Sequence, residues 1–446
     1  MSLKDSAVFA LVPVVYGFQK LYTVIPNSSS GDCTFSRGTT SSRINSGGLV
    51  EITPAHFPTV RYKMVDAEIV GCPEQSIQMG RINVVTYNEL FDSNWTFSNC
   101  TRVEDSTIEK PTGQFTAVRV MEGTSGTNDK KMTQTVTTVS GRKYCMSIYV
   151  KPYNTDNSRN PFDQAIRLKF GTKSCNFDVQ TGWSNDTTDD PQVQRLPNNW
   201  LRVSCIFEAN STSTSVEYWL SKSTGSSFTN NYTGDTDRGL ILYGAQVESN
   251  PGSNANEVSS LIPTESTTVT RSKDSVYRTS FFSSYIQDPY CIYWEGTIDR
   301  MTSGTCPLAV YGSSGTGVVF GFYLTNRATI NVLSKGSGTS EVLTSYDFRK
   351  FRGDYVKILA QFISSTEVSL TVNGSNLGVK THSQTSNNTS MTNIAVGYKG
   401  YSDNQQRQSC GQALIFPRKF TDSEAIEVTT SDSFDATIKE YKFLKA

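Results

Sequence analysis

Short segments in which apolar and polar residues alternate recur through most of this 446-residue chain. Lys143–Val150, Ala165–Phe170 and Trp200–Phe207 each place alternate side chains on one face of an extended strand. Clusters of Gly, Ser, Thr, Asn and Asp lie between such segments, and these residues favour turns. The pattern predicts antiparallel strands with one buried face. We therefore expect an all-β protein.

The length predicts two or three domains, since a domain takes about 100 to 200 residues. Residues 1–85 show few strand patterns, so we expect an irregular N-terminal anchoring segment. Residues 86–270 and 271–446 carry the alternating segments, and a polar stretch with Pro251 and Pro263 separates them. We expect two antiparallel β-sandwich (jelly-roll) domains there.

Two local signals lie in the last part of the chain. Asn373-Gly374 follows an alternating segment, and both residues tolerate the positive φ of a two-residue hairpin turn. Thr421 stands three residues before Glu424, which is the spacing of a helix capping box. We expect a hairpin at the first position and one short helix at the second.

Charge and rare residues argue against several function classes. Lys and Arg number 41, as do Asp and Glu, so no overall field attracts nucleic acid. The two histidines, His56 and His382, lie far apart in sequence, which disfavours histidine-based metal or triad chemistry. We expect a protein that is not an enzyme and binds no nucleic acid.

The nine cysteines are odd in number and show no CxxC spacing, so we expect free buried thiols rather than a zinc site. This usage suits assembly in a reducing cytoplasm. The start of the chain has no signal-peptide core, and no stretch reaches about 18 apolar residues. We therefore expect no membrane insertion.

A polar loop carries the candidate binding residues. Trp183 follows Gly182 in this loop, and a flat indole face packs well on a sugar ring, so we expect carbohydrate contacts at Trp183 and Asp186. Asp189 and Asp190 are candidate calcium ligands, because clustered carboxylates suit a hard cation. A solvated loop with no bound metal is the alternative, and we expect no other cofactor.

The first 85 residues cannot bury a core of their own, so they must pack on a sister domain, a second copy or a larger assembly. We expect particle-docking contacts from the apolar and aromatic residues of this segment. Those residues are Tyr16, Leu21, Tyr22 and Phe35.

Three stretches resemble phage structural proteins of the tail-fibre, receptor-binding and head-fibre types. Residues 31–45, GDCTFSRGTTSSRIN, are similar to the segment GDFTFSRGSxATRVN of those proteins, with Cys33 in place of a hydrophobic residue. Residues 83–95 and 242–271 resemble the two ends of a carbohydrate-binding-module-like jelly roll. Residues 372–374 and 414–426 resemble parts of a concanavalin A-like or laminin G-like sandwich.

The resemblance implies a tail-fibre or receptor-binding subunit of a virion, assembled in the host bacterial cytoplasm. Its partners would be other virion proteins, further copies of itself in a homo-oligomer such as a trimer, and a host surface glycan. A capsid-decorating or head-fibre protein is the first alternative. A polysaccharide-degrading enzyme of the virion is the second, and a secreted bacterial adhesin is the third.

Overall fold

Antiparallel strands dominate the structure, which confirms the all-β prediction. In the part of the chain described, one α-helix, α1 (Asp422–Thr430), accompanies them, and no helix is long and apolar enough to cross a membrane. The computed structural model describes residues 6–26, 28–126, 129–154, 163–250, 255, 257–280, 289–297, 307–312, 319–325, 329–335, 340–347, 355–364, 366–381, 391–397 and 408–430.

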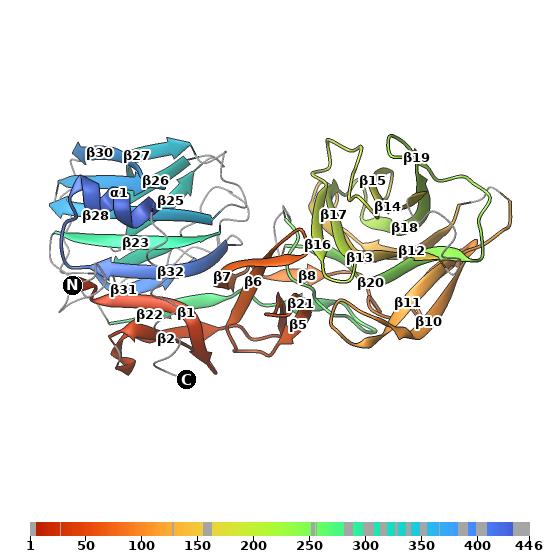
Figure 1. The fold of residues 1–446 in the computed structure, drawn as a ribbon, viewed down its shortest axis with the longest axis horizontal. Coiled ribbons are helices and arrows are strands. Elements are labelled where there is room, and N and C mark those ends of the chain that lie inside the picture. Colours follow the sequence, from red (N-terminus) through yellow and green to blue (C-terminus); the bar gives the residue numbers. More distant parts are fainter. Residues whose placement is uncertain are drawn as a thin grey trace.

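Two sheets form the middle sandwich, at the right of Figure 1. Their inner faces share one hydrophobic core, as the alternating pattern predicts. Sheet I contains β8 (Arg81–Asn83), β10 (Cys100–Glu109), β11 (Phe115–Glu122), β13 (Lys143–Asn154), β16 (Gln192–Leu196), β17 (Trp200–Glu208), β20 (Arg238–Ser249) and β21 (Val269–Arg271). Sheet II contains β9 (Thr96–Ser98), β12 (Lys131–Thr137), β14 (Gln164–Phe170), β15 (Lys173–Asp178), β18 (Ser213–Ser223) and β19 (Phe228–Thr229).

Strand β17 shows how sheet I presents two different faces. Leu201, Val203 and other odd-numbered residues of β17 enter the core of the sandwich. Trp200 and Arg202 point to the opposite face, where Trp200 belongs to a second apolar cluster. The alternation of side chains along the strand thus supplies the core of the middle sandwich on one face and a second, partly apolar surface on the other, which other segments cover.

The remaining large sheet, sheet III, forms the C-terminal sandwich at the left of Figure 1. Its strands enclose a core of their own, and α1 covers a smaller cluster that includes Ala425 and Val428. Sheet III contains β1 (Phe9–Gly17), β2 (Lys20–Ile25), β3 (Cys33–Ser36), β6 (Thr59–Val65), β7 (Glu68–Ile77), β22 (Ser275–Arg278), β23 (Tyr290–Thr297), β24 (Leu308–Gly312), β25 (Val319–Thr325), β26 (Thr329–Lys335), β27 (Ser340–Asp347), β28 (Tyr355–Ser364), β29 (Glu367–Val372), β30 (Ser375–Thr381), β31 (Met391–Val396) and β32 (Gln408–Phe416).

The expectation of an irregular, strand-poor N-terminal segment is wrong. β1 pairs with β32, with Phe9 opposite Ile415, and β3 pairs with β22, with Phe35 opposite Val276. Pro13 lies in β1 where the pairing with β2 shifts register, so an irregular strand tolerates the residue that interrupts the sequence pattern. The first strands therefore fill the middle of a sheet whose other members come from the end of the chain.

Other N-terminal strands contact the middle sandwich. The hairpin of β4 (Ser41–Ile44) and β5 (Val50–Thr53) brings Val50 against Trp200 on the outer face of sheet I. β7 pairs with β32, so the same segment also extends sheet III. Figure 1 shows these red and orange strands running beneath the C-terminal sandwich and between the two sandwiches.

Buried ion pairs join the segments where the sandwiches meet. Arg37 lies 3.2 Å from Asp274, and both side chains are fully buried. Asp274 also accepts a hydrogen bond from the backbone amide of Gln78. Arg81 lies 3.6 Å from Glu248 nearby. Removing one partner of such a pair would leave a buried charge uncompensated, so these contacts specify how the N-terminal segment sits.

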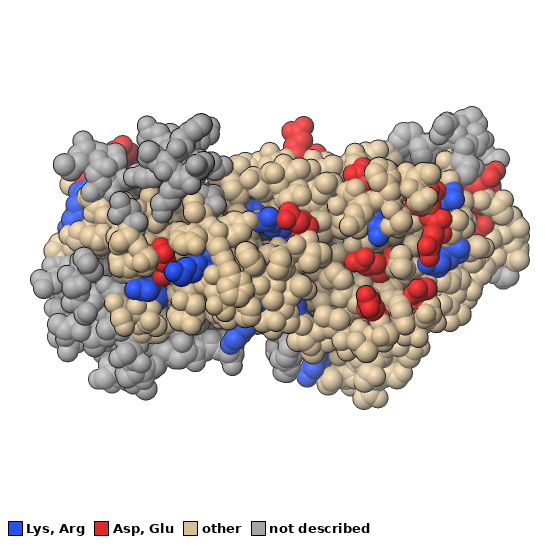
Figure 2. Space-filling view, turned by 90° about the horizontal axis from the view of Figure 1, so that it is seen from below, with Lys and Arg blue, Asp and Glu red and all other residues tan. Residues whose placement is uncertain are grey.

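The face of the molecule seen in Figure 2 is mostly uncharged. Acidic and basic side chains lie beside one another at several places on it, and acidic ones are the more frequent at the right, over the middle sandwich.

Candidate functional site

Trp183 lies in the loop after β15 and is 36% exposed. One face of its indole stacks on Phe228 of β19, with ring centroids 5.0 Å apart and planes 12° from parallel. Phe228 thus supports the indole from one side. Trp200, Trp219 and Trp294 are all buried.

Asp186 organises its own loop. Its carboxylate accepts hydrogen bonds from the backbone amide and hydroxyl of Thr188 and from the backbone amide of Asp189. Burial opposes the charged form, but these hydrogen bonds outweigh it and the pKa of Asp186 is lowered. Burial and the Asp186 carboxylate together raise the pKa of Asp189. These bonds describe a self-contained turn.

The predicted calcium ligands do not form a cluster of three with Asp186. Asp190 accepts a hydrogen bond from Nε2 of Gln192, 3.0 Å away. Among the residues whose structure is described, no group of three or more His, Cys, Asp or Glu side chains is placed to hold a metal ion. Calcium binding by Asp189 and Asp190 stays a prediction from the sequence.

Two of the four predicted docking residues face inward. Leu21 and Phe35 are fully buried in the core of the C-terminal sandwich, so neither offers surface to another protein. Their apolar side chains serve the chain's own fold instead. Tyr16 and Tyr22 are half-buried, and the hydroxyl of Tyr16 accepts a hydrogen bond from Nη1 of Arg43 at 2.7 Å.

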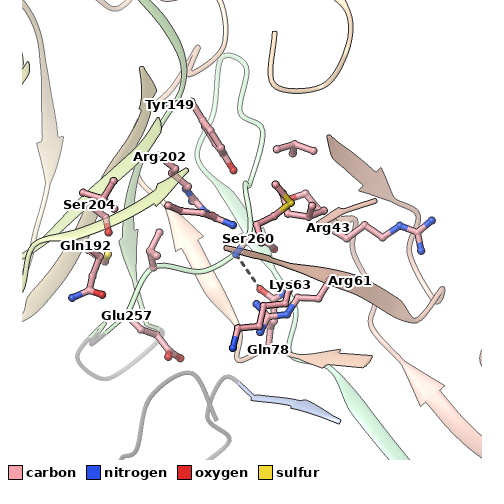
Figure 3. Close-up of a pocket in the computed structure, with 18 of the residues that line it drawn as sticks. Arg43, Arg61, Lys63, Gln78, Tyr149, Gln192, Arg202, Ser204, Glu257 and Ser260 are labelled. Carbon is pink, nitrogen blue, oxygen red and sulfur yellow. Dashed lines mark hydrogen bonds between the residues drawn. The ribbon is translucent and has the colours of Figure 1, made fainter. Parts of the chain in front are cut away.

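A cavity of about 300 Å³ lies between the N-terminal strands and the middle sandwich. β4 and β6 supply one side of it, and the outer face of sheet I supplies the other through β13, β16 and β17. Figure 3 shows Arg202 and Tyr149 reaching in from sheet I, with Arg61 and Lys63 opposite them on β6. We call this cavity the interface pocket.

Arg202 is the most buried cation of the interface pocket, with 5% of the residue exposed. Its Nη1 donates to the carbonyl oxygen of Ser259 at 2.7 Å, and its Nη2 donates to Oγ of Ser147 at 3.2 Å. The guanidinium carbon lies 5.0 Å from the centroid of the Tyr149 ring. Nε of Arg202 is buried without a hydrogen-bond partner.

The segment 257–260 covers one end of the interface pocket. The backbone amide of Ser260 donates to Oε1 of Gln78 at 3.0 Å, drawn as a dashed line in Figure 3. Glu257, from the same segment, also lines the pocket and lies 3.7 Å from Arg81. The segment therefore connects the pocket to the buried ion pairs between the sandwiches.

The lining of the interface pocket combines hydrogen-bonding groups of several kinds. Amides such as Gln192, hydroxyls such as Ser204, guanidinium groups, carboxylates and the Tyr149 ring all meet there. Hydroxyl-rich ligands need donors and acceptors in this mixture, together with an apolar surface for their ring carbons. The pocket therefore has the chemistry to bind a sugar.

Sequence reasoning reached this pocket at one residue. Asp190 lines it, whereas Trp183, Asp186 and Asp189 are not among its lining residues. Arg202 and Tyr149 were missed because they occupy outward positions of strands, which normally face solvent. Tyr149 and Trp200, large aromatic residues at such positions, were the available signal that another segment covers this face.

No family model and no curated protein matches this chain. Among solved structures, CBM40 of the Ruminococcus gnavus IT-sialidase, bound to alpha2,3 sialyllactose, is 12% identical over 33% of this chain and 86% of its own, with a TM-score of 0.30. Domains LG4-5 of the mouse laminin alpha1 chain are 10% identical over 65% and 85%, with a TM-score of 0.23.

The CBM22-1-CBM22-2 tandem domain of Xyn10C from Paenibacillus barcinonensis is 12% identical, covers 76% of this chain and 99% of its own, and has a TM-score of 0.24. Similarity this low carries no argument about function, so the function of the present chain is argued from its own residues.

Proposed function

We propose that this chain is a phage virion structural subunit of the tail-fibre or receptor-binding type, which binds a host surface glycan without cleaving it. The observation that carries glycan binding is the interface pocket, where hydrogen-bonding side chains from several segments meet beside the ring of Tyr149. The phage assignment rests on the sequence resemblance of residues 31–45, 83–95 and 242–271. A homo-oligomer would multiply weak single-site binding on the particle.

The proposed location on the particle, the tail, has an alternative, the capsid. A capsid-decorating or head-fibre protein would share the fold and the pocket and differ in its docking partner. Tyr16 and Tyr22 are the predicted docking residues that keep exposed surface. Imaging the particle by cryo-electron microscopy would separate tail from capsid, and absence of the protein from purified particles would contradict both.

Gln192→Ala tests glycan binding in the pocket. We expect the variant to bind an array-selected glycan about fivefold more weakly, because a lost hydrogen bond costs about 1 kcal/mol. Binding is measured by isothermal titration calorimetry. Gln114→Ala, at an exposed glutamine outside the pocket lining, is the matched control and should bind normally. Equal affinities for both variants would contradict binding at this pocket.

One observation favours the enzymatic alternative. Asp190 and Glu257 both line the interface pocket, and glycoside hydrolases use two carboxylates. The test is the release of reducing ends from host polysaccharide by the wild-type protein and by an Asp190→Asn, Glu257→Gln double variant. Cleavage that the double variant lacks would replace binding with turnover as the function of the pocket.

A further inference from the structure

The interface pocket holds a buried cation that no carboxylate of the described chain neutralises. Arg202 makes no ion pair with a described residue, although only 5% of the residue is exposed to solvent. Its hydrogen-bond partners are a carbonyl oxygen and a hydroxyl, both uncharged. A buried charge normally requires a partner of opposite sign, because losing its hydration costs several kcal/mol.

The guanidinium keeps donors for a ligand. It has five N–H groups, and the hydrogen bonds to Ser259 and Ser147 use two of them. Of the three that remain, the one on Nε is enclosed by the protein, so the second N–H groups of Nη1 and Nη2 are the donors left for a ligand. Two hydrogen bonds and the Tyr149 ring hold the guanidinium in place.

Charged side chains of both signs line the pocket beside Arg202. Arg43, Arg61 and Lys63 line it with Arg202, against two acidic residues, Asp190 and Glu257. Glu257 is also attracted to Arg81, 3.7 Å away and outside the lining, and Arg43 is neutralised by Glu51. Arg202 is the buried one among the charged residues that line the pocket, and a charge shielded from water attracts an anion more strongly than it would at the surface.

We propose that the interface pocket binds an acidic sugar, with Arg202 anchoring its carboxylate. This inference rests on the proposed function and adds the chemical class of the glycan. Carboxylates accept paired hydrogen bonds from a guanidinium, and the Tyr149 ring offers an apolar surface beside that anchor. The volume of about 300 Å³ is at the lower end for ligand pockets, so one terminal residue of a longer glycan would enter.

Matched sugars test the proposal directly. Glucuronate and glucose, and galacturonate and galactose, differ in carrying a carboxylate in place of a hydroxymethyl group. We expect the full-length protein to bind each uronate at least tenfold more tightly than its neutral partner in isothermal titration calorimetry. Added salt should weaken the binding of the uronates and leave the binding of the neutral sugars unchanged, because salt screens the attraction between opposite charges.

Variants locate the anchor. Arg202→Met should abolish the preference for uronates, and Lys63→Met should reduce it severalfold without disturbing the bonds that Arg202 makes. Lys380→Met, at an exposed lysine of β30 outside the pocket, is the control and should bind as the wild type does. Thermal unfolding of each variant checks folding, and Lys63→Met keeps the test valid should Arg202→Met not fold.

Each outcome decides a different claim. Equal binding of neutral and acidic sugars, lowered by Gln192→Ala, would overturn the inference and leave the proposed function standing. No binding of any sugar, on an array or in solution, would overturn both. A preference for uronates that survives Arg202→Met and Lys63→Met would place the acidic subsite elsewhere and overturn the role of Arg202.

Discussion

Glu217 organises the outer face of sheet II. Nζ of Lys131 and Nζ of Lys169 donate to its carboxylate at 3.0 and 3.1 Å, and Nε1 of Trp219 donates at 2.7 Å. Both ammonium groups also lie over the Trp219 ring. Burial opposes the charged carboxylate, but these hydrogen bonds outweigh it, so the pKa of Glu217 is lowered.

This lowered pKa predicts a loss of stability in acid. A carboxylate with a lower pKa in the folded state stabilises the fold above its unfolded-state pKa, about 4.3 for Glu, and loses that contribution as the pH falls through the folded-state value. We expect the free energy of unfolding to fall over this range. Urea unfolding at several pH values measures it.

Glu217→Gln should lose part of that pH dependence, because its side chain cannot be protonated. Glu265→Gln, at an exposed glutamate, is the matched control and should keep the dependence. Identical pH profiles for wild type and Glu217→Gln would show that Glu217 contributes nothing to the acid sensitivity.

Replacing Phe35 tests how strongly the N-terminal segment stabilises the C-terminal sandwich. The ring is fully buried on β3, opposite Val276. We expect Phe35→Ala to lower the free energy of unfolding by about 3–5 kcal/mol, the cost of removing a buried ring. Phe115→Ala, at a ring that is 58% exposed, should cost far less. Denaturant unfolding of both variants compares them, and equal losses would be the contradicting result.

Among the elements, those with local signals were predicted well from the sequence. Asn373 and Gly374 both have positive φ between the paired strands β29 and β30, which confirms the hairpin. Thr421 and Glu424 exchange hydrogen bonds with each other's backbone amides at the start of α1, which confirms the capping box. A few neighbouring residues determine such features, so the sequence displays them directly.

The N-terminal strands could not be predicted in the same way. β1 carries Pro13 and lacks a clean alternation, and its neighbour β32 lies at the other end of the chain. Long-range pairing determines such a strand, and it leaves no periodic signal in the segment itself. The sequence therefore left open whether this segment packs on a sister domain, a second copy or a larger assembly, and in the structure β1 pairs with β32 of the same chain.

This arrangement predicts that residues 271–446 do not fold alone. Without β1 to β3 the sheet would lose central strands, and β22 and β32 would expose unpaired edges. We expect a fragment of residues 37–446 to aggregate or to lack near-ultraviolet circular dichroism from its C-terminal half. A peptide of residues 6–36 added in trans should restore part of that signal. A well-folded, monomeric fragment would contradict the prediction.

At the scale of the whole molecule, the site depends on tertiary packing that no local pattern displays. Arg202 on β17 and Lys63 on β6 are distant in sequence, and the pocket forms because the N-terminal strands cover the outer face of sheet I. Sequence reasoning found the fold class and the two sandwiches. It could not find the pocket between the N-terminal strands and the middle sandwich, because the polar residues that line it have the same spacing as solvent-exposed ones.

The pairing of β1 with β32 also affects the order of events during synthesis. β1 can pair with β2 at once, but β32, its neighbour on the other side, is made roughly 400 residues later, so this second edge of β1 stays unpaired through nearly the whole of translation. During that interval the nascent chain carries an open sheet edge that a neighbouring copy could occupy. Correct folding thus requires that β1 pairs with β32 of its own chain before a strand of another copy occupies the same edge.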